Sequence, residues 1–247
     1  MLEKKPLITH MFSADPSAHS FNGKIYIYPS HDLDLELEDN DNGDQYAMVD
    51  YHVYEMANTE TLPKDCGCVL HIDNVPWASK QMWAPDCAEK KGTYYFYFPA
   101  RDKQGIFRIG VATSKNPAGP FVAQKEPIKG SLSIDPCIFA DDDGEYYLTY
   151  GGIWGGQLDK WKTGTFDPNG GEPPADKPAV TPKIAKMAPD MLEFAEEPRN
   201  LIIVDPAGRP LLAGDRGRRY FEDPWMHKYN GTYYFSYSTG DTHQLVY

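Results

Sequence analysis

Four acidic residues, Asp15, Asp86, Asp135 and Glu222, begin four similar stretches of the sequence, each beside a proline or one residue away from it. Two carboxyl groups on opposite sides of a bond can act as general acid and general base when their surroundings separate their pKa values. Hydrolysis of a glycosidic bond requires such a pair. Carboxylates held close together raise one another's pKa, so packing them costs stability and indicates a functional reason.

A simpler explanation exists for any single acidic residue beside a proline. Its carboxylate commonly accepts hydrogen bonds from backbone N–H groups of the same turn. The recurrence of an acidic residue at the start of four stretches favours the functional explanation. Whether the four residues meet depends on how the fold arranges the stretches that carry them.

The four stretches span residues 15–28, 84–98, 135–150 and 222–237, and each has the pattern of a β-hairpin. Their turns are Asn22-Gly23, Lys91-Gly92, Asp143-Gly144 and Asn230-Gly231, each followed by an aromatic-rich strand. Asn-Gly and Asp-Gly favour hairpins because both central residues of a type I′ turn need a positive φ. The acidic residues lie 71, 49 and 87 positions apart, which gives room for one four-stranded blade each. We predict an all-β propeller with about four blades, whose innermost strands bring the acids to one axis.

The segments between the hairpins are less regular. Residues 201–204 and 210–213 flank a turn and predict a hairpin that completes the third blade. The proline- and glycine-rich residues 167–182 predict a surface loop, and residues 187–195 are the best candidate for a short helical turn. Only 25 residues follow Glu222. We therefore expect a single catalytic domain, residues 1–247, that ends inside a blade.

Four motifs of the sequence are specific when taken together: ADPSAHSFNGKIYIYPSHD at 14–32, QMWAPD at 81–86, SIDPCIFADDDGEYYLTYGG at 133–152 and FEDPWMHKYNGTYYFSYSTGDTH at 221–243. Together they resemble glycoside hydrolase family 43. The resemblance covers the whole chain and implies a five-bladed β-propeller from which the last blade is missing here. It also implies β-xylosidase, α-L-arabinofuranosidase or endo-arabinanase activity.

The resemblance assigns roles to three of the acids. Asp15 would be the general base that deprotonates water, and Glu222 the general acid that protonates the leaving oxygen. Asp135 would tune the pKa of the acid and hold it in position. The implied reaction is inversion in a single displacement, which needs acid and base about 6.5–9.5 Å apart. Asp223 stands where a small residue more often follows the acid, a departure that can alter the leaving-group side of the pocket.

The implied substrate is a plant xylo- or arabino-oligosaccharide with a terminal xylose or arabinofuranose. The alternative is a non-catalytic propeller that binds carbohydrate or protein at its channel mouth. Survival of all three acids favours the enzyme. The sequence contains no Gly-x-Ser-x-Gly elbow, phosphate-binding glycine loop, HExxH motif or dinucleotide fingerprint, which argues against other common enzyme classes.

We predict six substrate-binding residues: Trp83, Trp154, His31, Asp32, Asp86 and His243. The two tryptophans offer flat faces for the C–H groups of a pentose, although tryptophan is often simply core. His31 and Asp32 follow the first hairpin and either hydrogen-bond sugar hydroxyls or form a plain loop. Asp86 either contacts substrate or pairs with an arginine. The resemblance places His243 near the pocket, and a solvated turn is its alternative.

The net charge of −12 arises from 36 acidic and 24 basic side chains, and it disfavours nucleic-acid and anionic membrane partners. The first ten residues, MLEKKPLITH, contain no apolar run, so neither a signal peptide nor a membrane anchor is visible and we expect a cytoplasmic protein. A propeller that lacks a blade has open edges. The sequence leaves open whether the chain is a fragment or is completed by a second copy or another polypeptide.

No metal site is evident from the sequence. The four cysteines, Cys66, Cys68, Cys87 and Cys137, lack zinc-site spacing and are expected to be reduced packing residues. The acidic residues 32–44 lack the glycine of a calcium-binding EF-hand loop and predict a solvated or rim loop. The expected chemistry needs no cofactor. Some members of the family hold a calcium ion at the propeller axis through a histidine of the fifth blade, but ligands for it are not evident here.

Overall fold

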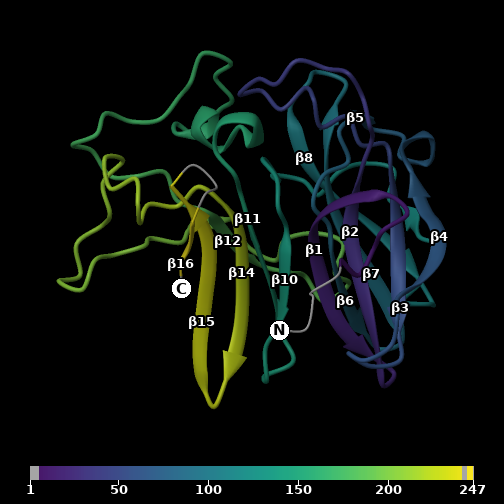
Figure 1. Cartoon of the computed structure of the whole chain (residues 1–247). Coiled ribbons are helices and arrows are strands. Elements are labelled where there is room, and N and C mark those ends of the chain that lie inside the picture. Colours follow the sequence, from purple (N-terminus) through teal and green to yellow (C-terminus); the bar gives the residue numbers. More distant parts are fainter. Residues whose placement is uncertain (1–5, 241–243, 247) are drawn as a thin grey trace, which may run out of the picture.

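The computed structural model describes residues 6–240 and 244–246 and consists of antiparallel β-sheets with short 3₁₀ helices (Figure 1). The first sheet contains β1 (Phe12–Phe21), β2 (Lys24–Asp32), β3 (Asp50–Met56) and β4 (Lys64–His71). The second contains β5 (Ala78–Lys80), β6 (Asp86–Lys90), β7 (Thr93–Asp102), β8 (Phe107–Ser114) and β9 (Val122–Ala123). The third contains β10 (Cys137–Ala140), β11 (Tyr146–Tyr150), β12 (Lys183–Lys186) and β13 (Arg199–Asn200). The fourth contains β14 (Glu222–Tyr229), β15 (Thr232–Thr239) and β16 (Gln244–Val246).

The four sheets follow one another along the chain as blades of a propeller. Strands β1, β6, β10 and β14 pack against their counterparts in neighbouring sheets near the middle of the molecule, whereas β4 and β16 lie toward its two sides (Figure 1). The predicted acidic positions lie in or next to these strands: Asp15 lies within β1, Asp86 and Glu222 begin β6 and β14, and Asp135 lies two residues before β10. The predicted all-β propeller with about four blades is therefore confirmed.

Local turn chemistry explains why the hairpins form where they do. At Asn22-Gly23, Lys91-Gly92 and Asn230-Gly231 both residues have positive φ, between 48° and 76°, as a type I′ turn requires. The third hairpin differs. Only Gly144 of the Asp143-Gly144 pair is left-handed, and its N–H donates to the carbonyl of Asp141 (3.0 Å), so this turn is closed by a different geometry.

The core lies between blades, and strand β7 shows why its sequence is so aromatic. Phe96 and Phe98 belong to the cluster shared with the first blade, and both are fully buried. Tyr97 points the other way into the cluster shared with the third blade, where it meets Leu148 and Tyr150. Successive side chains of a strand face opposite sides, so a blade between two others must be apolar on both.

Two local predictions hold only in part. Residues 187–195 contain a turn, closed by the N–H of Met191 donating to the carbonyl of Ala188 (2.9 Å). They form no helix, because Met187 and Phe194 form an isolated β-bridge and Pro189 disfavours helical geometry at the residue before it. The third blade is completed by β13 (Arg199–Asn200) and not by the predicted hairpin at 201–213. That hairpin forms as a short ladder, in which the N–H of Leu211 donates to the carbonyl of Ile203 (3.0 Å) and the N–H of Asp205 to that of Arg209 (2.8 Å).

The helical segments of the described chain are η1 (Ile72–Asn74), η2 (Trp154–Gly156) and η3 (Leu158–Trp161). The last two lie in the long connection between β11 and β12, which also contains the predicted loop at 167–182. A search of the described residues finds no helix with the length and apolar character needed to span a bilayer.

Candidate active site

A cavity of about 500 Å³ lies where the inner strands begin, and we call it the axial cavity. Its wall includes Asp15, Asp135 and Glu222 from three different blades, together with Trp83 and Trp154. The structure thus brings together the three carboxyls and the two tryptophans that the sequence placed at one site. They are separated by up to about 200 residues along the chain and meet only because the hairpins are arranged radially.

The backbone at the acidic positions is unusual and is shared between blades. Asp15, Asp135 and Asp223 each precede a proline and have φ of 46°, 55° and 54°, a left-handed conformation that is costly for a residue with a side chain. In blades one and four the strand register also shifts at this point, between Ala14 and Ser17 and between Glu222 and Trp225. A bulge of this kind turns the side chain out of the regular pleat.

This geometry corrects the equivalence predicted from the sequence. The corresponding residues of the four blades are those directly before a proline, namely Asp15, Ala84, Asp135 and Asp223, which lie around one cavity. Glu222 precedes this position by one residue, and Asp86 follows it by two. The second blade therefore contributes an alanine where the others contribute an acid, and the fourth blade contributes two adjacent acids.

Burial and mutual charge raise the pKa values of the carboxyls in the axial cavity. Asp135 is almost fully buried, and this burial, followed by the charges of Asp223, Glu222 and Asp15, raises its pKa well above the usual range. Burial, followed by the charges of Asp223 and Asp15, likewise raises the pKa of Glu222. The backbone N–H of Asp223 donates to Asp135 (3.2 Å) and partly offsets the shift at Asp135.

Asp15 is the carboxyl of this group whose pKa falls near neutrality. Its side chain opens onto the cavity, yet protein atoms surround most of the carboxyl group. This burial, with the charges of Asp223 and Asp32, raises the pKa of Asp15 to about 7. A pKa near 7 suits Asp15 to act as a base near neutral pH, and the raised pKa of Glu222 favours the protonated form that a general acid needs.

Trp83 is fixed on one side of the cavity by packing and by a hydrogen bond. Its indole N–H donates to the carbonyl of Tyr46 (2.7 Å), and its ring centroid lies 4.7 Å from that of Phe107. Gly43 lies directly against the ring, since a Cβ on this residue would come within 2.5 Å of the indole. The ring is thereby held in one orientation.

Trp154 is held by the long loop of the third blade. Its indole N–H donates to Glu172 (2.9 Å), its backbone N–H donates to Asp159 (2.9 Å), and its ring packs edge-on against Phe221. Glu172 also pairs with the buried Arg219 (3.0 Å). Glu172, 18 positions away, thus orients the indole of Trp154. The sequence around Trp154 does not predict this contact.

The other predicted binding residues divide into three groups. Asp32 lines the axial cavity, where burial raises its pKa. The neighbouring His31 does not line the cavity and instead contacts Asp50 (2.6 Å). His243 lies outside the described residues.

Asp86 is buried beneath the cavity and joins three blades. One carboxylate oxygen contacts Nε2 of His19 on β1 (2.5 Å), and the other accepts from the backbone N–H of Ile138 on β10 (2.7 Å). Burial would lower the pKa of His19, but the charge of Asp86 and its hydrogen bond to the ring together outweigh burial, so the pKa is raised. Of the two interpretations offered above, the geometry favours structural pairing, with a histidine as the partner in place of an arginine.

The rim of the cavity contains residues that the sequence did not single out. The acidic segment at 32–44 and its continuation contribute Asn40, Asp41, Gly43, Gln45 and Tyr46 to the wall, in agreement with the predicted rim loop. Buried Arg101 anchors this loop by donating to the carbonyl of Asn42 (2.7 Å) and to that of Gly155 (3.5 Å). No motif marks Arg101, because its partners lie more than 50 residues away.

The axial carboxyls do not form a ready site for a cation. Among residues 6–240 and 244–246, no three of them offer ligand atoms close enough together to share one ion.

A propeller that brings paired carboxyls and tryptophan faces to one cavity is the architecture of a glycoside hydrolase. The sequence profile described as "Glycosyl hydrolases family 43" matches residues 4–247. The chain belongs to this family, whose members form five-bladed propellers, and the described residues supply four sheets of that fold.

Relatives with known names agree with this assignment. The chain is 57% identical over 250 residues to "Xylosidase/arabinosidase 43A" of Humicola insolens, covering 98% of this chain and 76% of that protein. It is 51% identical over 248 residues to "Xylosidase/arabinosidase" of Bacteroides ovatus, covering 99% and 76%. One similar solved structure is a β-xylosidase/α-arabinofuranosidase from a compost microbial metagenome, in complex with xylotriose and in a calcium-free form. It matches this chain with a TM-score of 0.96 and 57% identity, and the match covers 98% of this chain and 74% of that one.

Proposed function

We propose that this glycoside hydrolase removes terminal xylose or arabinofuranose units from plant oligosaccharides with inversion of configuration. The observation that carries the proposal is the convergence of Asp15, Asp135 and Glu222 on a cavity flanked by Trp83 and Trp154. The pentose preference is supported by relatives named as xylosidases and arabinosidases. The alternative of a non-catalytic propeller gives no reason to keep acids whose pKa values are separated in this way.

Asp15 and Glu222 divide the chemistry in this mechanism. The Asp15 carboxylate takes a proton from a water molecule, which attacks the anomeric carbon from the face opposite the leaving group. Glu222, kept protonated by burial and by the charges of Asp223 and Asp15, gives its proton to the departing oxygen. Because Asp15 ends protonated and Glu222 ionised, one proton must return through solvent before the next turnover.

Asp135 and Asp223 position and tune the acid. Asp135 accepts the backbone N–H of Asp223 (3.2 Å) and so fixes the residue next to Glu222. Asp223 also accepts from Ser238 (2.8 Å), and its charge is the largest neighbouring influence on Glu222. The tuning that the resemblance assigned to Asp135 is thus shared with Asp223. Gly152 allows this packing, since a Cβ there would lie 3.1 Å from the Cβ of Glu222.

The proposal is tested with two aryl glycosides and one product analysis. Release of p-nitrophenol from the β-D-xyloside and from the α-L-arabinofuranoside establishes the pentosidase, and proton NMR of the first product formed shows whether its anomeric configuration is inverted. No release from either glycoside, with binding of xylo-oligosaccharides retained, would favour the non-catalytic alternative.

The pH dependence of kcat/KM should show an acidic limb near pH 7. Asp15 must be ionised to act as base, and the pKa of Asp15 is raised to about 7, so activity falls as the pH drops through this value. Asp223→Asn removes the largest charge acting on both Asp15 and Glu222 and lowers both pKa values. We therefore expect both limbs of the profile to move to lower pH in Asp223→Asn, because profiles of kcat/KM report the free enzyme's acid and base.

Asparagine keeps the size of Asp223 and the ability to accept from Ser238, so loss of structure should not confuse this comparison. Asp143→Asn, in the exposed third hairpin turn, is the matched control and should leave the profile unchanged. An acidic limb that stays in place in Asp223→Asn would contradict the assignment of Asp15 as its origin.

Trp83→Ala should weaken substrate binding more than turnover. An aromatic contact contributes about 0.5–1.5 kcal/mol beyond simple burial, which corresponds to a rise in KM of roughly 2- to 12-fold. Trp83→Phe keeps a flat face in the same place and should lose much less. Initial rates with xylobiose and xylotriose measure both parameters, and equal KM values for the alanine and phenylalanine variants would show that Trp83 is not a sugar platform.

A further inference from the structure

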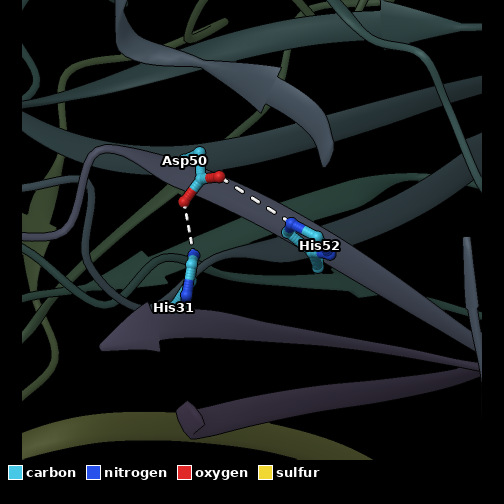
Figure 2. Close-up of side chains that lie close together, drawn as sticks. All are labelled: His31, Asp50 and His52. Carbon is cyan, nitrogen blue, oxygen red and sulfur yellow. Dashed lines mark hydrogen bonds and ion pairs between the residues drawn. The ribbon is translucent and has the colours of Figure 1, made fainter. Parts of the chain in front are cut away.

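A second group of chemically competent side chains lies on the first blade, outside the axial cavity. His31 at the end of β2 faces Asp50 and His52 of β3, as Figure 2 shows. His31 Nδ1 lies 2.6 Å from one carboxylate oxygen of Asp50, and His52 Nε2 lies 3.8 Å from the other. One potential ligand atom from each residue lies within 4.8 Å of those of the other two, and none of the three residues lines the axial cavity.

Strand pairing explains how these residues meet. Strands β2 and β3 pair Ile27 with Tyr54, and continuing this register along both strands sets His31 opposite Asp50. His52 follows Asp50 by two residues and therefore lies on the same face of the sheet. Because side chains alternate, the same pattern sends His31 to this face and Asp32 to the axial cavity.

The hydrogen bonds of His52 leave a gap that a cation can fill. Nδ1 of His52 lies 3.0 and 3.1 Å from the two carboxylate oxygens of Asp65, so this nitrogen carries the donated proton. The lone pair of Nε2 then points toward Asp50 across 3.8 Å, which is too long for a hydrogen bond. In this neutral tautomer two acceptors face each other without a donor between them.

A carboxylate behind a histidine is the usual outer partner of a metal ligand. It fixes the tautomer and the ring orientation, and its removal commonly lowers metal affinity by about 10–100-fold. Asp65 fills this place behind His52 and is itself held by Nε2 of His10 (3.1 Å). The pair Asp65–His52 therefore has the form of an outer partner with its ligand.

The donor set selects the class of ion. Two imidazoles and one carboxylate suit zinc and similar transition metals, whereas calcium prefers six to eight oxygen ligands. Side chains of the three residues are 14% to 20% exposed, so an ion can enter and keep water as a fourth ligand. In a tetrahedral zinc site with bonds of roughly 2.0–2.2 Å, the ligand atoms lie about 3.4 Å from one another. The distance between His31 Nδ1 and the Asp50 carboxylate, 2.6 Å here, must therefore increase slightly when zinc replaces the proton between them.

We propose that His31, Asp50 and His52 bind one Zn²⁺ ion, with Asp65 orienting His52 from behind. The ion joins the end of β2 to β3 on the face of the first blade opposite Asp32. It takes no part in glycosidic cleavage, so this inference is independent of the proposed function. The alternative occupant of the gap is a proton on Nε2, which would make His52 an imidazolium between Asp50 and Asp65.

Isothermal titration calorimetry with ZnCl₂ at pH 7.5, on protein first stripped with a chelator, distinguishes a zinc site from a site occupied by a proton on Nε2 of His52. We expect saturable binding of one ion per chain with a Kd in the micromolar range or below, and little competition from a millimolar excess of Ca²⁺. His52→Ala and His31→Ala should each weaken binding at least 100-fold, and Asp65→Asn by about 10–100-fold. Cobalt in place of zinc should give the intense visible absorption of a tetrahedral site.

The matched control is His227→Ala. His227 lies on β14 in the fourth blade and stacks on Tyr234 (ring centroids 5.0 Å apart), so its loss should leave the zinc affinity unchanged. Circular dichroism and thermal melting identify any variant that fails to fold, and His52→Gln then replaces His52→Ala. Absence of saturable binding in the wild-type protein, or binding that survives both His31→Ala and His52→Ala, would overturn the proposal and leave the proton as the occupant.

Discussion

Asp15→Ala should lower kcat/KM by about 10²–10⁴-fold for every substrate, including aryl glycosides with good leaving groups. The base activates water, and this step is needed whatever group departs. Asp15 is the axial carboxyl whose pKa, at about 7, permits ionisation near neutral pH while Glu222 remains protonated. The loss should fall on kcat more than on KM, since water activation occurs only in the transition state.

The same variant should retain its fold, which separates a catalytic from a structural role. Because the pKa of Asp15 is raised from 3.8 in the unfolded chain to about 7, its contribution to the free energy of unfolding is present below pH 3.8 and is lost as the pH rises through 7. At pH 8 the ionised carboxylate therefore destabilises the native state, and Asp15→Ala should unfold at an equal or higher urea concentration than the wild-type protein. An Asp15→Ala protein that is folded and fully active would refute the mechanism.

Glu222→Gln should produce a loss that depends on the leaving group. An unactivated alkoxide, such as the one that departs from xylobiose, needs the proton of the acid, so kcat/KM should fall by about 10²–10⁴-fold. A p-nitrophenolate departs without protonation, so the loss with the aryl xyloside should be smaller by at least tenfold. The measurement is the ratio of the two kcat/KM values in the variant and in the wild-type protein.

The base and acid variants thus serve as controls for each other. Asp15→Ala should affect both substrates alike, whereas Glu222→Gln should discriminate between them. Basic pH provides a further check, since Glu222→Gln should lose the alkaline limb that the wild-type protein shows when its acid ionises. Equal losses on both substrates in Glu222→Gln would show that another carboxyl is the general acid. Asp223 would then be the first candidate, because its charge acts most strongly on Glu222.

Features encoded within a few residues could be predicted from the sequence. The Asn-Gly, Lys-Gly and Asp-Gly turns, the alternating aromatic strands and the acids beside prolines specify four hairpins because turn geometry and side-chain alternation are local properties. Recurrence of these hairpins predicted a radial arrangement, and that arrangement was enough to place Asp15, Asp135 and Glu222 in one cavity.

Tertiary structure alone decided which neighbouring residue faces the cavity. A bulge moves Asp15 and Asp223 out of the regular pleat, and a difference of two residues turns Asp86 into a buried link to His19, 67 positions away. The orientation of Trp154 by Glu172 and the meeting of His31 with Asp50 likewise depend on contacts between segments that are distant in sequence. Strand register and packing between blades are set by the chain as a whole, because a shift of one residue exchanges the two faces of a strand.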